Sequence, residues 1–247
     1  MNCKGRVITF LLLGCMIALA GCGPTNQDLV DQFSPGFAEM RTALQRVAGA
    51  LPASVGGDQG VAQPPDPQPV YKEGAEDIQN TDILMYDYLL DPETELRDQD
   101  QLDLRLSNYL RRLLQWTGPE SPMSPSVLKK RAQEGLTEEF EQALQIRYLG
   151  VARVARYDPP VAVSEEVFTG GYAEVDGFLV DMTTQEVLCA FRITARPNDE
   201  VSYTYKEGES KTEALENFAY STLWTNARTA FVEKMTELCG GQFALRD

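Results

Sequence analysis

The fold is decided by the stretch "VFTGGYAEVDGFLVDMTTQEVLCAFRITARP", residues 167–197, which predicts a β-hairpin. Two strands, 167–181 and 186–197, are joined by the four-residue turn "MTTQ". In the second strand the period of two places one set of side chains inward (Val187, Cys189, Phe191 and Ile193) and the other outward (Arg192, Thr194 and Arg196). Gly170 and Gly171 mark a candidate bulge in the first strand.

A third strand precedes this hairpin. The segment "IRYLGVARVARY", residues 146–157, also has a period of two, and the "DPP" that follows ends it. Three strands joined in this order form an antiparallel meander.

Segments with a helical period surround the strands. Ser210 and Glu213 have capping-box spacing and open a long last helix that Gly240 ends. Its predicted buried stripe consists of Leu215, Ala219, Leu223, Ala227, Ala230, Phe231, Met235 and Leu238. Upstream, an apolar stripe over 102–114 predicts a helix, and shorter helices are expected over 127–134 and 137–144. The segment "DILMYDYLLD", residues 82–91, fits both helix and strand and favours helix.

These patterns predict the α+β class, with an antiparallel β-meander of about three strands packed against flanking helices. We expect two layers, with helices covering one face of the sheet, in a domain of residues 77–247.

The region before this domain has two parts. Within residues 22–51, apolar residues spaced three and four apart predict a short amphipathic helix (Phe37, Met40, Leu44, Val47 and Leu51). Residues 52–76 are rich in proline and glycine and are predicted to form a linker. The alternative is that this segment docks on the domain as a strap.

The first 21 residues have the pattern of an export signal. Lys4 and Arg6 precede an apolar run of about 14 residues, which is shorter than the roughly 20 that a membrane-spanning helix needs. Three cleavage patterns are present: "ALA" at 18–20 for ordinary signal peptidase, "LLGC" ending at Cys15, and "LAGC" ending at Cys22.

Leu19-Ala20-Gly21-Cys22 resembles the lipobox of bacterial lipoproteins at every position, whereas the Cys15 site has bulky Leu13 where a small residue is usual. The resemblance implies that Cys22 becomes the first residue of the mature chain and carries diacylglycerol, often with a further acyl chain (palmitate). Two or more chains hold a protein firmly on a membrane. Because Gly23 rather than Asp follows the cysteine, the resemblance favours the outer membrane, facing the periplasm, with a Gram-positive surface as the alternative.

The net charge of the chain limits the classes of partner that it can bind. The full chain has a net charge of −15, and removal of residues 1–21 takes away two basic residues, leaving 20 basic minus 37 acidic, or −17. Phosphate polymers repel such a chain, so no nucleic-acid partner is expected. The alternative is that a negative charge of this size only keeps the protein soluble.

Cys189 and Cys239 are the cysteines left for the folded part. In an oxidising compartment an even pair is a disulfide candidate. The alternative is that both are small buried apolar residues.

The sequence contains no histidine, which removes Ser-His-Asp and Cys-His nucleophiles and the usual zinc hydrolase sites. The stretch "GGYAEVDG" lacks the spacing of a phosphate-binding loop, and "DPETELRDQDQLD" lacks the glycine and final acid of a calcium loop. We therefore predict no catalytic residue, no metal site and no cofactor. A carboxylate pair remains open as an alternative, drawn from Glu165, Glu166, Glu174 and Asp176.

Exposed aromatic residues offer a binding surface instead. Tyr203 and Tyr205 lie on one side of the extended stretch "VSYTYKEGES", and tyrosines in loops often anchor interfaces. The alternative is that they pack against the sheet edge or the last helix. The sequence thus predicts a membrane-anchored envelope lipoprotein that presents a non-catalytic domain to a protein or cell-wall partner. The alternatives are a glycan hydrolase with a carboxylate pair and a carrier of an apolar ligand.

Overall fold

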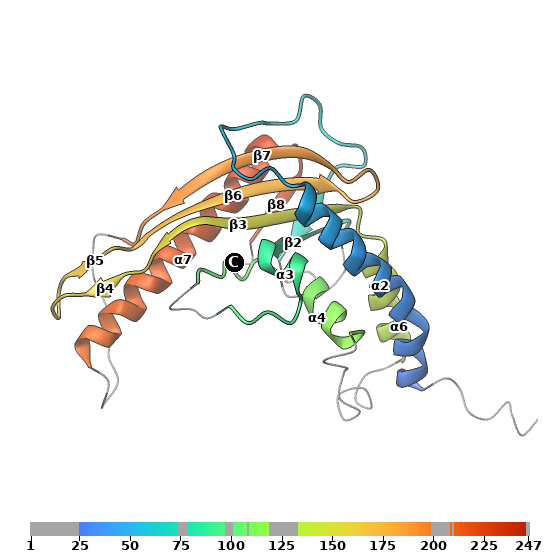
Figure 1. Cartoon of the computed structure of the whole chain (residues 1–247), viewed down its shortest axis with the longest axis horizontal. Helices are drawn as coiled ribbons and strands as arrows, with labels where there is room; N and C mark the ends of the chain where they lie inside the picture. The colour runs from blue at the N-terminus through green and yellow to red at the C-terminus, as the bar shows by residue number, and fades with distance from the viewer. Residues whose placement is uncertain are drawn as a thin grey trace, which may run out of the picture.

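The structure is a computed structural model, and it describes residues 25–73, 79–96, 101–107, 109–118, 133–198, 208 and 210–245. Figure 1 shows an arched sheet with helices packed on it, which confirms the α+β class. The elements in chain order are α2 (Asn26–Ala50), β1 (Val70–Lys72), β2 (Thr81–Met85), α3 (Tyr86–Leu90), α4 (Tyr109–Trp116), α6 (Gln133–Leu144), β3 (Tyr148–Asp158), β4 (Val161–Ala162), β5 (Phe168–Thr169), β6 (Tyr172–Asp181), β7 (Glu186–Ala195), α7 (Lys211–Leu238) and β8 (Gln242–Ala244).

The predicted antiparallel meander forms the centre of a four-stranded sheet with the order β2-β3-β6-β7. β6 and β7 pair as the expected hairpin around the turn at 182–185, and β3 pairs antiparallel with β6. The two glycines expected in a bulge, Gly170 and Gly171, have positive φ and separate β5 from β6. The register shifts of the sheet lie elsewhere, between Val154 and Arg156 in β3 and at the Leu179/Val180 step of β6.

A fourth strand, β2, lies parallel to β3, and sequence periodicity does not reveal it. The segment 82–91 contains both of the expected alternatives, because the chain runs as β2 to Met85 and turns directly into α3 at Tyr86. All five residues of β2 are buried, so the strand shows no alternation of apolar and polar residues.

The long helix α7 covers one face of the sheet (Figure 1). Ser210 caps it by accepting a hydrogen bond from the backbone N–H of Glu213 at 3.1 Å, as the spacing predicts. Six of the eight residues in the predicted stripe are buried: Leu215, Ala219, Leu223, Ala227, Phe231 and Met235. Cys189 on β7 and Cys239 at the end of α7 lie at disulfide distance with Cα atoms 5.4 Å apart, as predicted. The bond ties the helix to the sheet.

The expectation that helices cover one face of the sheet is wrong, because helices cover part of the second face as well. Helices α2, α3, α4 and α6 pack on the side opposite α7, where they bury Leu149, Phe178 and Val180. The physical reason is that both alternating sets of side chains are apolar in this half of the sheet, including Leu179 on the α7 side. A sheet with two apolar faces needs cover on both.

The first helix belongs to this core. α2 begins after Thr25, whose side chain and that of Asp28 form a reciprocal capping box, and Pro35 lies inside the helix. Phe37, Leu44 and Val47 of α2 are buried against α6 and the sheet. The packed domain therefore includes α2, which lies before the predicted start at residue 77.

Residues 52–73 run along the domain as a strap, which is the alternative to the expected free linker. Gln59 exchanges two backbone hydrogen bonds with Ala190 of β7, at 2.7 and 2.9 Å. Further on, β1 pairs in parallel with β8, and the buried Tyr71 donates a hydrogen bond to the carbonyl of Leu106. A sequence rich in proline and glycine docks here because its backbone groups find partners on other elements. Residues 74–76 lie outside the described residues.

The helix predicted over 102–114 is shorter than expected. Leu102, Leu104 and Leu106 are buried from a non-helical segment, and α4 begins only at Tyr109. The buried carboxylate of Asp82 holds this start, because it accepts the backbone N–H of Leu110 at 3.0 Å. Burial raises the pKa of Asp82 to about 6, despite three hydrogen bonds that favour its charged form. α6 begins at Gln133, ahead of the expected Thr137, and residues 127–132 lie outside the described residues.

Candidate functional site

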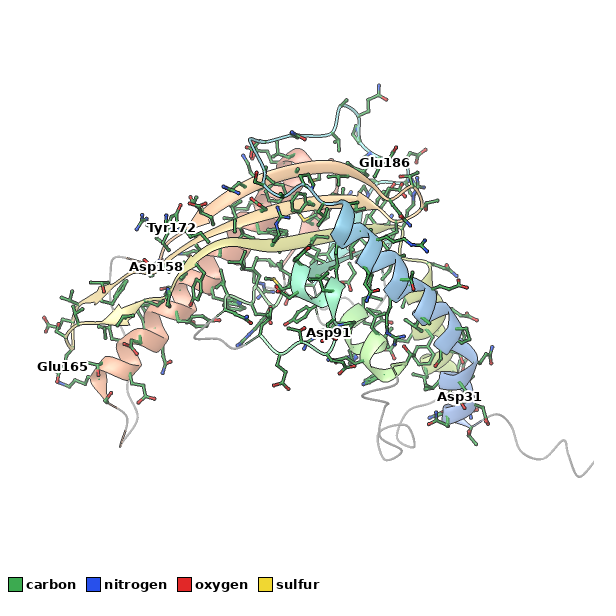
Figure 2. The ribbon with its side chains drawn as sticks, in the orientation of Figure 1. Asp31, Asp91, Asp158, Glu165, Tyr172 and Glu186 are labelled. Carbon is green, nitrogen blue, oxygen red and sulfur yellow. A yellow bond between two sulfur atoms is a disulfide. The ribbon has the colours of Figure 1, made fainter. Side chains whose placement is uncertain are left out.

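No helix among the described elements lies over the outer half of the sheet face opposite α7 (Figure 1). The helices on that side pack over Leu149, Val151, Phe178 and Val180, and the strands continue beyond them with polar residues in the same rows. Figure 2 shows Tyr172 on this uncovered part of the sheet. We call it the arginine face and define it by Arg153, Arg156, Tyr172, Glu174, Asp176, Arg192 and Arg196.

Asp176 forms the buried inner end of the arginine face. Its side chain is 1% exposed and accepts hydrogen bonds from Arg153 at 2.9 Å and from Arg192 at 2.7 Å. The sheet register places Asp176 directly between the two arginines, on the middle of three strands. Arg192 donates its hydrogen bond to the Asp176 carboxylate, and this bond raises the pKa of Arg192.

Tyr172 forms the outer, open end. Its ring lies between two guanidinium groups, with the carbon Cζ of Arg156 at 5.4 Å and that of Arg196 at 4.8 Å from the ring centroid. The Tyr172 hydroxyl donates a hydrogen bond of 2.7 Å to Glu174, and this bond raises the pKa of Tyr172. Stacking on an aromatic ring orients a guanidinium without using its N–H donors.

The two outer arginines differ from the two inner ones in their partners. In the part of the chain that the structure describes, neither Arg156 nor Arg196 has a carboxylate within 4 Å. Both side chains are exposed. Each can therefore offer its planar set of N–H donors to a carboxylate or phosphate from another molecule. The arginine face thus gathers four arginines of a strongly acidic chain, and Asp176 and Glu174 pair with the inner two.

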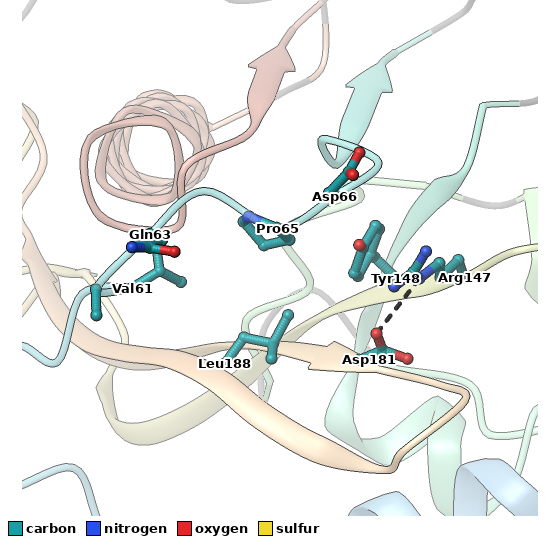
Figure 3. A pocket seen from close by; sticks show the side chains of 9 residues that line it. Val61, Gln63, Pro65, Asp66, Arg147, Tyr148, Asp181 and Leu188 are labelled. Carbon is teal, nitrogen blue, oxygen red and sulfur yellow. Dashed lines mark hydrogen bonds and ion pairs between the residues drawn. The ribbon is translucent and has the colours of Figure 1, made fainter.

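A second feature is a hollow of about 360 Å³ between the strap and the start of β3 (Figure 3). Arg147 and Asp181 form an ion pair at 3.4 Å on its floor, and the Tyr148 hydroxyl donates a hydrogen bond to the Pro67 carbonyl at 2.8 Å. The strap contributes the opposite wall, from Val61 to Asp66. Because charged groups line it, this hollow does not supply the closed apolar cavity that a carrier of an apolar ligand requires.

The four candidate catalytic carboxylates fall into two groups, one in the loop between β4 and β5 and the other on β6. Glu165 lies in the loop between β4 and β5 and forms an exposed ion pair with Lys211 at 2.7 Å, and the neighbouring Glu166 is exposed. Glu174 and Asp176 share the face of β6, and Arg192 binds both of them. The arrangement therefore positions Glu174 and Asp176 to hold arginines in place.

The other predicted site residues are either brought together in the structure or lie outside the residues that it describes. Cys189 and Cys239 are brought together, as described above. Cys22 with its lipobox, and Tyr203 and Tyr205, lie outside the described residues. Within the described ranges, no cluster of three or more metal-ligating side chains occurs and no helix is long and apolar enough to cross a membrane.

Sequence reasoning missed the arginine face as a site, although it placed part of it. Arg192, Thr194 and Arg196 were expected to point outward from β7, and Arg192 does so together with the stacked Arg196. The available signal was the four-residue spacing of Arg192 and Arg196 in "FRITARP", which places both on one face of a strand. Arg153 and Arg156 are three residues apart, and the register shift between Val154 and Arg156 brings both to the same face. The register that sets Tyr172 and Asp176 between them is a tertiary feature.

Comparison with protein-family models, with curated protein sequences and with solved structures finds no significant match. The chain is therefore described by its own fold and site. It is an α+β domain in which α7 covers one face of the sheet and other helices cover part of the opposite face. Arginines line the rest of that opposite face, where no described helix lies.

Proposed function

We propose that this protein is a lipid-anchored envelope protein that presents a non-catalytic α+β domain, and that its arginine face binds an anionic protein or cell-wall partner. The anchor is Cys22, and the location is the outer membrane, facing the periplasm. The lipobox supports the anchor. The arginine face supports the binding role.

One observation carries the binding role: Arg156 and Arg196 flank Tyr172 on an uncovered sheet face and have no carboxylate partner among the described residues. Arginines without a structural partner are costly to keep oriented, because a free side chain has high rotamer entropy. Stacking on Tyr172 lowers that cost and leaves the N–H donors available. Oriented, unpaired guanidinium groups suit recognition of carboxylates or phosphates.

The anchor is tested by the intact mass of the full-length protein expressed in a bacterial envelope. A mass that begins at Cys22 and includes diacylglycerol or three acyl chains is expected. A lipid-free mass that begins after Ala20 would contradict the anchor.

The binding role is tested with the full-length protein in detergent against two probes, polyglutamate and purified cell-wall sacculi. The double variant Arg156→Gln/Arg196→Gln is expected to bind at least tenfold more weakly to whichever of the two probes the wild-type protein binds. Each charge-assisted hydrogen bond to a guanidinium contributes about 1.5–3 kcal/mol, which is roughly tenfold or more.

The matched control is Arg46→Gln/Lys72→Gln, which removes the same charge from exposed positions on α2 and β1. It should change affinity less than twofold. Equal losses in the two double variants would show attraction by overall charge alone and would overturn the binding role. Absence of binding to both probes would do the same.

A further inference from the structure

The outer edge of β7 has backbone groups beside the arginine face that no described residue binds. β7 is the last strand of the sheet, and the strap contacts its edge through Ala190, whose N–H and C=O both bond to Gln59. Because backbone groups alternate along a strand, the N–H and C=O of Arg192 and Thr194 point the same way as those of Ala190. In the described part of the chain these four groups have no hydrogen-bond partner.

Both ends of this open edge are fixed. The strap closes it at Ala190, and the side chain of Asn226 on α7 donates a hydrogen bond to the carbonyl of Arg196 at 2.8 Å. With respect to the described ranges, the free length is therefore residues 191–195, which is about 17 Å of strand. A short extended segment fits this length.

The side chains along the edge specify the charge of such a segment. Arg192, Thr194 and Arg196 occupy successive positions of one row, on the open face. In a strand added to β7, alternate side chains would lie directly beside this row. Carboxylates at those alternate positions would meet Arg196, which lacks a carboxylate partner among the described residues, and Arg192.

We propose that the edge of β7 from Arg192 to Ala195 receives a short acidic segment of a partner protein as a fifth strand of the sheet. This inference rests on the proposed function and deepens it, because it selects a polypeptide from the anionic partners. A polypeptide carries backbone donors and acceptors at the spacing that the edge presents, and a glycan or lipid headgroup does not.

The pairing orientation follows the strap. Gln59 meets Ala190 in an antiparallel bridge, so the edge already accepts one antiparallel residue. In an antiparallel pair, a residue directly opposite Thr194 points both its backbone groups at β7 and its side chain to the arginine face. The acidic residues of the partner are therefore also the residues whose amides bond to β7.

The test uses the full-length protein in detergent and fluorescent hexapeptides of alternating glutamate and valine. Two versions carry N-methyl groups, one on the glutamate amides and the other on the valine amides. We expect the parent and the valine-methylated peptide to bind alike and the glutamate-methylated peptide to bind at least tenfold more weakly, because at least two hydrogen bonds of about 1 kcal/mol each are lost. The amide of Thr194 should also exchange its hydrogen more slowly when the parent peptide is bound.

Charge is tested in the same assay. Arg196→Gln should weaken binding of the parent peptide about fivefold or more, and the exposed control Arg46→Gln should leave it unchanged. A glutamine-valine peptide should bind more weakly than the glutamate-valine parent.

The outcomes separate the two proposals. Binding that depends on Arg156 and Arg196 but is equally sensitive to both methylation patterns overturns strand addition and leaves the arginine face as an anion-binding surface. If only the valine-methylated peptide binds weakly, the added strand is parallel, and the antiparallel pairing proposed here is wrong. If no acidic peptide binds while sacculi do, the polypeptide partner is wrong and the proposed function stands.

Discussion

Asp176 gives the sharpest test of how the arginine face is built. Replacing it as Asp176→Asn keeps the size of the side chain and removes the charge that holds Arg153 and Arg192. Breaking a buried ion pair by removing one partner typically costs about 3–5 kcal/mol. Here Arg192 is one-third exposed and keeps Glu174 at 3.4 Å, so water and a second carboxylate offset part of the loss. We expect Asp176→Asn to lower the free energy of unfolding by about 2–4 kcal/mol.

The assay is urea unfolding of the full-length protein in detergent, followed by tryptophan fluorescence. The control is Glu165→Gln, which breaks an ion pair of the same 2.7 Å length between Glu165 and Lys211, with side chains 60% and 44% exposed. Exposed pairs contribute about 0–1 kcal/mol, so this variant should lie close to the wild type. If the two variants lose the same amount, burial does not set the strength of the Asp176 network and the reasoning is wrong.

Three further predictions concern the core. Gly177→Ala should destabilise the protein by about 1–3 kcal/mol or more in urea unfolding, because an added Cβ would lie 2.2 Å from the buried ring of Phe191; an unchanged midpoint would contradict this. Cys239→Ser should cost about 4 kcal/mol, the loop-closure value for a disulfide spanning 50 residues, and adding reductant to the variant should cause no further loss. Between pH 4 and 6 the folded protein binds more protons at Asp82 than the unfolded chain, so the stability that this group contributes falls as pH rises. The free energy of unfolding of Asp82→Asn, measured relative to that of the wild type, should therefore rise by up to about 3 kcal/mol from pH 4 to pH 7. A difference that stays constant over this range would refute the raised pKa.

Elements with local determinants could be predicted from the sequence. The β6–β7 hairpin follows from the alternation in the outer part of its strands and from a four-residue turn, and α7 follows from its cap and its stripe. Both faces of β2 are buried, so its residues carry no periodicity, and its pairing with β3 depends on contacts distant in sequence. The docking of the strap could not be predicted either, because a composition rich in proline and glycine is found in free linkers and in docked segments alike.

The candidate site also has parts that local sequence patterns predict and parts that depend on tertiary contacts. Outward-facing arginines are visible in the sequence of β7, because alternation assigns each residue to a face. Which helices leave that face open is decided by how α2 and α6 pack, and the pairing of Asp176 with Arg153 depends on the register between β3 and β6. Local patterns contain no information about either.

The early start of α2 fixes the distance between the proposed anchor and the domain. Four peptide steps separate Cys22 from Asn26, the first residue of α2, so the lipidated residue reaches at most about 14 Å from the helix. The domain would therefore rest against the bilayer surface at that end of α2. In Figure 1 this end and the β4–β5 hairpin lie at opposite ends of the long axis, and Figure 2 labels Tyr172 near the hairpin. Short attachment at the proposed anchor would thus orient the molecule, with the arginine face directed away from the lipid.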